Sequence, residues 1–326
     1  MAFAKTLFKT SLSVGGALGT LAIINKVTEA MAGELDTVLT GEERRYPWKY
    51  GDMFYKVQGT RNAKPLVLIH SLGPGASSYE WRKNVDTLAE QFRVYTLDLL
   101  GFGLSDHPTI DYDADLYADL ISDFIKEAVK ETVDQPAIVV GHGLTNAYII
   151  AAAYRRPQLF ERLVLVEPSP LILEETNPGP ISTLWKVLLR TPIVGQFIYN
   201  LLTSRQAIRG YYDKQGYHNP GLITDELVEY IFTSAHQPNS RFAVASLLSN
   251  HLNLGVQEPF SRLKTPVVAV WGREGTLTPS EASAPFKRVN PDIVVQIIDK
   301  ASLHLQDEQA GQLNNLIREF ARTAVG

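Results

Sequence analysis

The chain has 326 residues, with 31 Lys and Arg against 35 Asp and Glu, which gives a formal net charge of −4 at pH 7. This balance excludes binding of nucleic acid through a large net positive charge, because phosphate recognition needs a basic surface. The absence of cysteine excludes disulfides, cysteine-ligated zinc, iron–sulfur clusters and a cysteine nucleophile. We therefore expect no nucleic-acid partner, no metal and no cofactor.

The amino terminus is apolar. It holds sixteen uncharged residues, Thr10 to Asn25, and a membrane-spanning helix needs about 20 apolar residues. Three interpretations of residues 1–33 stay open: a signal peptide with a cleavage site at Ala30-Met31-Ala32, a membrane anchor or surface helix, and a helix that packs on a partner or on the protein itself. We favour membrane contact through residues 1–26 over secretion.

Farther along, the apolar pattern predicts strands that alternate with helices. We interpret residues 34–64 as polar and charged, with Arg44 to Trp48 in a connecting arm, followed by a strand from Gly51 to Gln58. Short apolar runs predict further strands at residues 65–70, 92–97, 137–140, 162–166, 266–271 and 293–298. Helical patterns fall at residues 78–90, 112–132, 146–156 and 309–322. This order predicts a mostly parallel sheet with helices on both faces.

One segment breaks the alternation. Residues 171–261 contain helical stretches and many aromatic residues but no strand-like run. An insertion between two strands of a parallel sheet lies over the carboxyl edge, where such sheets bind ligands. We therefore interpret residues 171–261 as a helical lid on a core formed by residues 34–170 and 262–326.

Three loops at predicted strand ends carry motifs. They are His70-Ser71-Leu72-Gly73-Pro74-Gly75, Asp98-Leu99-Leu100-Gly101-Phe102-Gly103 and Gly141-His142-Gly143-Leu144-Thr145. In this order and spacing the loops resemble the α/β-hydrolase superfamily, in particular its lidded members related to epoxide hydrolases and haloalkane dehalogenases. The resemblance covers residues 50–323 and implies an α/β-hydrolase fold. The loop sequences also resemble cyanobacterial and plastid branches, which implies a membrane-associated or cytoplasmic protein, on the thylakoid side if membrane-bound.

The resemblance assigns three catalytic positions, and none of them holds a catalytic side chain. The nucleophile position is Gly143, the acid position after Trp271-Gly272 is Gly275, and the base position is Leu303. Glycine accepts the positive φ that a nucleophile turn requires, so the turn is expected to survive. Without a nucleophile no acyl-enzyme forms, and covalent hydrolysis is therefore not expected.

Neighbouring residues leave an alternative open. Glu274 lies beside the acid position and His304 beside the base position, so a displaced set could activate water without a covalent step. A lone histidine in such a loop is more often a surface or capping residue. Some members of the superfamily place the acid near Glu167, which we interpret here as a loop or helix-cap residue. His142 and Thr145 flank the nucleophile position and are expected to have structural roles there.

The framework of a binding cavity is retained in the sequence. Backbone N–H groups of the first loop and of Leu144 are expected to form an oxyanion hole. The candidate ligand-binding residues are His70, Ser71, Leu72, Gly73, His142 and Leu144. The favoured hypothesis is a catalytically degenerate protein, not an enzyme, that binds a small apolar ligand or a protein partner at a membrane. The alternative is an active esterase-like or epoxide-hydrolase-like enzyme that uses His304 and Glu274.

Overall fold

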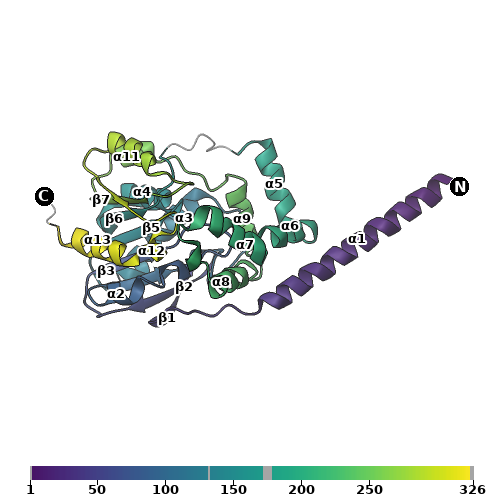
Figure 1. The fold of residues 1–326 in the computed structure, drawn as a ribbon, viewed down its shortest axis with the longest axis horizontal. Helices are drawn as coiled ribbons and strands as arrows, with labels where there is room; N and C mark the ends of the chain where they lie inside the picture. The colour runs from purple at the N-terminus through teal and green to yellow at the C-terminus, as the bar shows by residue number, and fades with distance from the viewer. Residues whose placement is uncertain (1, 131–132, 172–177, 324–326) are drawn as a thin grey trace.

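A single mixed sheet forms the centre of the protein in the computed structural model, which describes residues 2–130, 133–171 and 178–323. Its strand order is β1-β2-β4-β3-β5-β6-β7-β8 (Figure 1). The strands are β1 (Glu42–Trp48), β2 (Gly51–Gln58), β3 (Pro65–Ile69), β4 (Arg93–Leu97), β5 (Ala137–His142), β6 (Phe160–Val166), β7 (Val267–Gly272) and β8 (Val294–Ile298). β1 and β2 pair antiparallel with their neighbours, and β3 to β8 run parallel. The predicted mostly parallel sheet is confirmed.

Helices cover both faces of this sheet. They are α2 (Val85–Ala89), α3 (Ala114–Phe124), α4 (Thr145–Arg155), α11 (Ser283–Val289), α12 (Leu305–Glu308) and α13 (Ala310–Arg322), with single turns η1 (Ser78–Trp81), η2 (Ile125–Val129), η3 (Pro157–Leu159) and η6 (Ser280–Ala282). Alternate residues of β3 point to opposite faces, as the pleat of a strand requires. Val67 and Ile69 join the core under α3 and α4, whereas Leu66 and Leu68 join the core under α2 and α13.

The connecting arm predicted at Arg44–Trp48 is wrong, because these residues belong to β1. The strand pairs antiparallel with β2, with Glu42 opposite Val57. Only Tyr46 is buried in it, so the strand has one apolar contact and an otherwise exposed, charged sequence. Pro47 is tolerated because an edge strand forms ladder hydrogen bonds on one side only.

Two predicted helices differ from the structure in extent. The helix predicted at residues 78–90 is divided into η1 and α2, and between them the buried Asn84 donates a side-chain hydrogen bond to Asn314 of α13 at 2.9 Å. The helix predicted at residues 112–132 begins one residue after Asp113, which caps it, and continues through η2 as a π-helix. Its last two residues lie outside the described residues.

An all-helical insertion lies between β6 and β7. It contains α5 (Pro180–Arg190), α6 (Val194–Leu202), α7 (Arg205–Tyr211), η4 (Tyr212–Gly216), η5 (Pro220–Leu222), α8 (Asp225–Ala235), α9 (Arg241–Leu248) and α10 (Gln257–Ser261). The loops after β3 and β4 approach it so closely that only glycine fits. A Cβ on Gly75 would lie 2.3 Å from the carbonyl oxygen of Ile231 in α8, and one on Gly101 would lie 2.8 Å from Cβ of Ala243 in α9. The insertion therefore covers the carboxyl edge of the sheet.

The amino-terminal segment forms one long helix, α1 (Ala2–Ala32), that extends away from the body of the protein (Figure 1). Its carboxyl-terminal part packs on α6 and α8 of the insertion. The buried Asn25 donates to the carbonyl of Ile193 at 2.9 Å and accepts from the side chain of Asn200 at 3.1 Å. Among the helices of the described residues, none combines the length and the apolar character that crossing a membrane requires.

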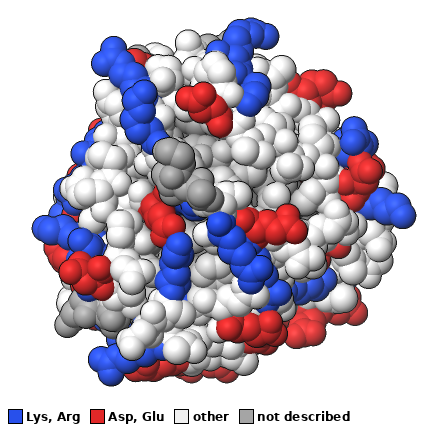
Figure 2. Space-filling model, turned by 90° about the vertical axis from the view of Figure 1, so that its left-hand side faces the viewer, with Lys and Arg blue, Asp and Glu red and all other residues white. Residues whose placement is uncertain are grey.

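The face beside the carboxyl terminus carries basic and acidic side chains in alternation (Figure 2). Neither sign gathers into a broad patch on this face, in keeping with a net charge of −4 over 326 residues. Such a mixed surface produces no strong field of one sign.

Candidate functional site

The turn that follows β5 keeps the geometry of a nucleophile turn without a nucleophile. Gly143 has a φ of +62°, and its N–H donates to the carbonyl of Val166 at 3.0 Å before α4 begins at Thr145. A Cβ added to Gly143 would meet only Cβ of Ser71, at the ordinary contact distance of 3.5 Å. The backbone and the space for a side chain are therefore both present, and the reactive group is missing.

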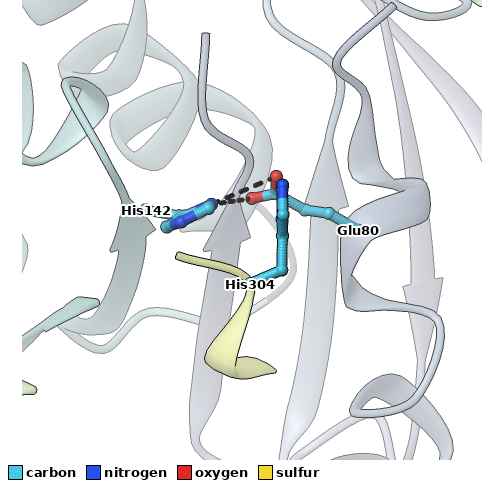
Figure 3. Close-up of side chains that lie close together, drawn as sticks. All are labelled: Glu80, His142 and His304. Carbon is cyan, nitrogen blue, oxygen red and sulfur yellow. Dashed lines mark hydrogen bonds and ion pairs between the residues drawn. The ribbon is translucent and has the colours of Figure 1, made fainter. Parts of the chain in front are cut away.

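Three ionisable side chains from distant segments converge beside this turn (Figure 3). Glu80 comes from η1, His142 is the last residue of β5, and His304 precedes α12. Nδ1 of His142 lies 3.2 Å from both carboxylate oxygens of Glu80. One nitrogen or oxygen atom from each of the three side chains lies within 4.8 Å of the other two.

The cluster is held from outside by further hydrogen bonds. The N–H and the hydroxyl of Ser71 each donate to the Glu80 carboxylate at 2.9 Å. Nε2 of His142 donates to the carbonyl of Leu303 at 2.9 Å, which fixes the orientation of the ring. The side-chain amide nitrogen of the fully buried Gln306 lies 3.3 Å from Nδ1 of His142 and 3.4 Å from Nδ1 of His304.

The two partners of the ion pair shift each other's pKa. Burial alone would lower the pKa of His142, but the adjacent Glu80 carboxylate outweighs burial and raises it above its usual value. Burial would raise the pKa of Glu80, but the charge and hydrogen bond of His142 outweigh burial and lower it. Burial, reinforced by the charge of His142, lowers the pKa of His304 to about 4. These pKa directions favour an ion pair of Glu80 and His142 beside a neutral His304 imidazole.

His304 is neither a surface residue nor a capping side chain, as the sequence had suggested, but is enclosed by aromatic rings of the insertion. Its ring stacks on Tyr217 with centroids 5.2 Å apart and meets Tyr212 edge-on at 5.1 Å. Its backbone N–H donates to the carbonyl of Gly216 at 3.0 Å. The insertion therefore fixes His304 next to Glu80 and His142.

The carboxylate of Glu167 lies beside the position where the superfamily places its acid. Glu167 follows β6 with a φ of +45°, and its buried side chain accepts hydrogen bonds from the N–H of Gly272 and the hydroxyl of Thr278. Oε2 of Glu167 lies 3.7 Å from the Cβ that a residue at Gly275 would carry. Burial raises the pKa of Glu167 to about 7. Glu167 lies in a loop, as predicted. Its side chain, however, is buried and bonded to Gly272 and Thr278, which the sequence did not suggest.

Glu274, the predicted alternative acid, does not join the cluster that contains His304. Oε2 of Glu274 accepts a hydrogen bond from the N–H of Ala301 at 3.0 Å. The carboxylate in the cluster with His304 belongs to Glu80 instead.

The first loop differs from the expected oxyanion hole. The N–H of Ser71 already donates to Glu80, so a carboxylate of the protein itself occupies that donor. Nε2 of the buried His70 accepts from the N–H of Leu99 at 2.9 Å, and its carbonyl accepts from the hydroxyl of Thr145 at 2.8 Å, which makes His70 a structural residue. The remaining predicted ligand-binding residues Leu72, Gly73 and Leu144 are partly buried.

Sequence reasoning missed Glu80 and Gln306. The only sequence signal for Glu80 is its place between two aromatic residues, Tyr79 and Trp81. Both aromatic side chains are buried in the structure, and the carboxylate between them lies in the interior as well. Gln306 follows the predicted base position by three residues, and its side chain is not titratable, so no motif singles it out. Neither residue belongs to the superfamily pattern quoted above.

Little space is enclosed between the insertion and the sheet at the hollow beside the loops after β3 and β4. This hollow has no room for a water-sized molecule. It is lined by Gly75, Ala76, Gly101, Phe102, Gly103, Tyr199, Ser234, Ser240 and Val244. Pockets for drug-sized ligands have volumes of roughly 300–1,000 Å³.

Comparisons with known proteins agree with this architecture. The family model described as "Alpha/beta hydrolase family" matches residues 66–315. The (Lyso)-N-acylphosphatidylethanolamine lipase of Mus musculus is 24% identical over 286 residues, which cover 81% of this chain and 80% of the lipase.

Solved structures also resemble the chain. A 2-hydroxy-6-oxo-6-phenylhexa-2,4-dienoate hydrolase from Rhodococcus sp. strain RHA1 matches with a TM-score of 0.69 at 19% identity, covering 88% of this chain and 100% of the hydrolase. A membrane phospholipase A, described as a bacterial virulence factor, matches with a TM-score of 0.67 at 18% identity, covering 97% of each chain. At these identities the structural matches show the fold alone.

Proposed function

Because the chain belongs to the alpha/beta hydrolase family, we propose that it is a member that has lost covalent hydrolysis and acts by binding at a lipid surface. The observation that carries the proposal is Gly143 at the nucleophile position. Its backbone adopts the required positive φ, yet no atom there can attack a carbonyl carbon. Removing the nucleophile from a catalytic triad costs on the order of 10⁶ in turnover.

The interior of the site supports the same conclusion. The Glu80 carboxylate already accepts the hydrogen bond of the Ser71 N–H, a donor in the loop that would stabilise a developing oxyanion. Its negative charge also repels an anionic intermediate. The hollow lined by Gly75, Phe102 and Tyr199 has no room for a water-sized molecule and so none for an acyl chain or an aromatic substrate. Binding through the outer surface of the insertion is therefore favoured over binding in the former pocket.

An exposed apolar surface extends over α1, α5 and α6, and α6 packs against both of the other helices. Its side chains are Ile23, Val27 and Met31 of α1, Ile181, Leu184 and Trp185 of α5, and Leu201 and Leu202 of α6. Ile181, Leu184 and Trp185 follow one face of α5, and Trp185 is 50% exposed. Exposed apolar side chains on neighbouring helices are typical of sites of membrane or protein interaction.

A lipid surface fits this area better than a second protein. Residues 10–24 of α1 are uncharged and follow two lysines, Lys5 and Lys9, which suits insertion into acyl chains beneath anionic headgroups. Tryptophan side chains such as Trp185 favour the membrane interface. A lipase of N-acylphosphatidylethanolamines is among the similar proteins, which supports an ancestry at lipid surfaces.

Turnover of short-chain and medium-chain p-nitrophenyl esters tests the loss of hydrolysis. We expect the wild-type protein to remain at the background rate, and His304→Gln and Glu274→Gln to leave that rate unchanged. Turnover by the wild type that disappears in His304→Gln would show that a displaced catalytic set is at work.

Co-sedimentation with vesicles tests the lipid surface. Vesicles of phosphatidylcholine, with and without phosphatidylglycerol, are mixed with the wild type, with the double variant Leu184→Ser and Trp185→Ser, and with Leu277→Ser. We expect the double variant to bind about tenfold more weakly, because two apolar side chains lose their transfer into the interface. Leu277 is similarly exposed but lies on the core domain, so its variant should bind like the wild type. Equal binding by all three proteins would contradict the proposed surface.

A further inference from the structure

The side chains of Glu80, His142 and His304 form a set that metal sites in proteins commonly use. Two imidazoles and one carboxylate approach one another from three separate segments, with candidate ligand atoms within 4.8 Å. In a tetrahedral zinc site each nitrogen or oxygen ligand lies about 2.0–2.2 Å from the ion, which places ligand atoms roughly 3.3–3.6 Å apart. Nδ1 of His142 and the Glu80 oxygens already lie at 3.2 Å, and the His304 ligand atom lies within 4.8 Å of both.

We propose that Glu80, His142 and His304 bind one Zn²⁺ ion, with the side-chain oxygen of Gln306 as the fourth ligand. This inference goes beyond the proposed function and does not depend on it. It also revises our expectation from the sequence, where the absence of cysteine excluded cysteine-ligated zinc and we expected no metal.

The surroundings of the cluster match the outer shell of a metal site. A ligating histidine usually donates its second N–H to a carbonyl or carboxylate, and Nε2 of His142 donates to the Leu303 carbonyl in this manner. That bond leaves Nδ1 of His142 as the metal-facing nitrogen. Ligating carboxylates are hydrogen-bonded in turn, and Glu80 accepts from both the N–H and the hydroxyl of Ser71.

Gln306 lies close enough to both imidazoles to supply a fourth ligand atom. Its side chain is fully buried, and its amide nitrogen lies 3.3 Å and 3.4 Å from Nδ1 of His142 and of His304. The oxygen and nitrogen of an amide exchange places by rotation about the terminal bond. In the rotated form Oε1 accepts a hydrogen bond from Nδ1–H of His142 in the metal-free protein, and the same position lets it bind a cation that displaces this proton.

Zn²⁺ suits this donor set because it accepts imidazole and carboxylate ligands in a closed tetrahedral site. Magnesium and calcium prefer oxygen ligands alone, and a set with two imidazoles disfavours both. On binding, the ion takes the place of the proton that lies between Nδ1 of His142 and Glu80, and this proton leaves to solvent. The ion would link η1, the end of β5 and the segment before α12.

The test is a Zn²⁺ titration of the full chain after treatment with a chelator, read by competition with a chromophoric indicator and by elemental analysis. We expect one equivalent of zinc per chain. Glu80→Gln and His304→Gln should each weaken zinc binding by more than about 100-fold. Loss of a residue that only hydrogen-bonds to a ligand weakens metal binding by at most about this factor. His218→Gln is the matched control, because His218 is an exposed histidine outside the cluster and its loss should change nothing. Circular dichroism establishes that each variant is folded.

Replacement by Co²⁺ gives a second readout, which does not depend on the stability of any variant. Tetrahedral Co²⁺ with nitrogen and oxygen ligands absorbs strongly in the visible range, and octahedral Co²⁺ absorbs weakly. An intense spectrum at one equivalent supports the site. A weak spectrum, an absence of zinc binding at micromolar concentration, or equal affinity in wild type, Glu80→Gln and His304→Gln would each overturn the proposal. None of these measurements involves ester turnover or lipid, so they fail or succeed separately from the proposed function.

Discussion

Ser71 donates two hydrogen bonds, one from its N–H and one from its hydroxyl, to the same carboxylate of Glu80, each at 2.9 Å. The loop that the superfamily resemblance assigns to an oxyanion is thus bound to an anion of the protein itself. Glu80 in turn pairs with His142, the residue immediately before the empty nucleophile position. Ser71, Glu80 and His142 thus belong to one internal polar network.

Loss of the charge on Glu80 should destabilise the fold. Glu80→Gln leaves the buried His142 without its counter-ion, and breaking a buried pair in this way costs about 3–5 kcal/mol. The free energy of unfolding is measured by urea denaturation with a chelator present, so that no metal contributes. We expect the double variant Glu80→Gln and His142→Gln to lose less than the sum of the single variants. Additive losses would mean that the two side chains do not interact.

A serine at position 143 should be accepted by the fold without restoring hydrolysis. Gly143→Ser places an L-residue at a φ of +62°, which costs about 1–2 kcal/mol, but its Cβ meets no atom closer than 3.5 Å. Gly141→Ala is the contrasting variant, because its Cβ would lie 2.2 Å from Cδ1 of Ile149. Thermal unfolding should rank Gly141→Ala as much the more destabilised. The reverse order, or ester turnover by Gly143→Ser alone, contradicts this prediction.

Restoring the acid at its expected position should fail. In Gly275→Asp the new Cβ lies 3.0 Å from the carbonyl oxygen of Thr278, and the new carboxylate lies beside Glu167. We expect a loss of roughly 1–3 kcal/mol, in the range of overpacked sites, with a smaller loss for Gly275→Ala. The triple variant that adds Gly143→Ser and Leu303→His should therefore be less stable than the wild type. A triple variant of wild-type stability in urea would show that the site relaxes more freely than these distances imply.

Glu167 makes the stability of the protein depend on pH. Its pKa is about 7 in the folded protein against a usual value of 4.5, so the folded state binds more protons between these values. The free energy of unfolding therefore falls as pH rises from about 4.5 to 7, by up to roughly 3 kcal/mol from this group. In Glu167→Gln this fall is removed, while the hydrogen bonds with Gly272 and Thr278 can still form. Urea denaturation of both proteins across this range should give free energies of unfolding that diverge as pH rises. Parallel plots of free energy against pH would contradict the raised pKa of Glu167.

Much of the fold could be predicted from the sequence because its strands are short, fully apolar runs. The runs in β3, β5 and β7 are buried on both faces, and their pattern needs no knowledge of neighbours. β1 could not be predicted in this way, since its charged residues face solvent and only Tyr46 is buried. Its identity as a strand depends on pairing with β2, which is a tertiary property.

The residues of the site could be predicted only in part. The resemblance assigns the nucleophile, acid and base positions to Gly143, Gly275 and Leu303, and the loss of the triad stays a prediction. The cluster that occupies the same region depends on contacts between residues as far apart as Glu80 and His304, and no local pattern encodes them. The orphaned oxygen of Gln306 likewise follows from packing alone.

The contact between Asn25 of α1 and Ile193 has a consequence for the order of events during synthesis. These residues are 168 positions apart, and α1 packs on helices of the insertion, which leave the ribosome long after it. At about 5–20 residues per second, α1 is without its packing surface for roughly 10–30 s. Throughout this interval its uncharged stretch is exposed to whatever binds nascent apolar helices, so the nascent chain meets a lipid surface or a chaperone before the domain to which α1 belongs exists.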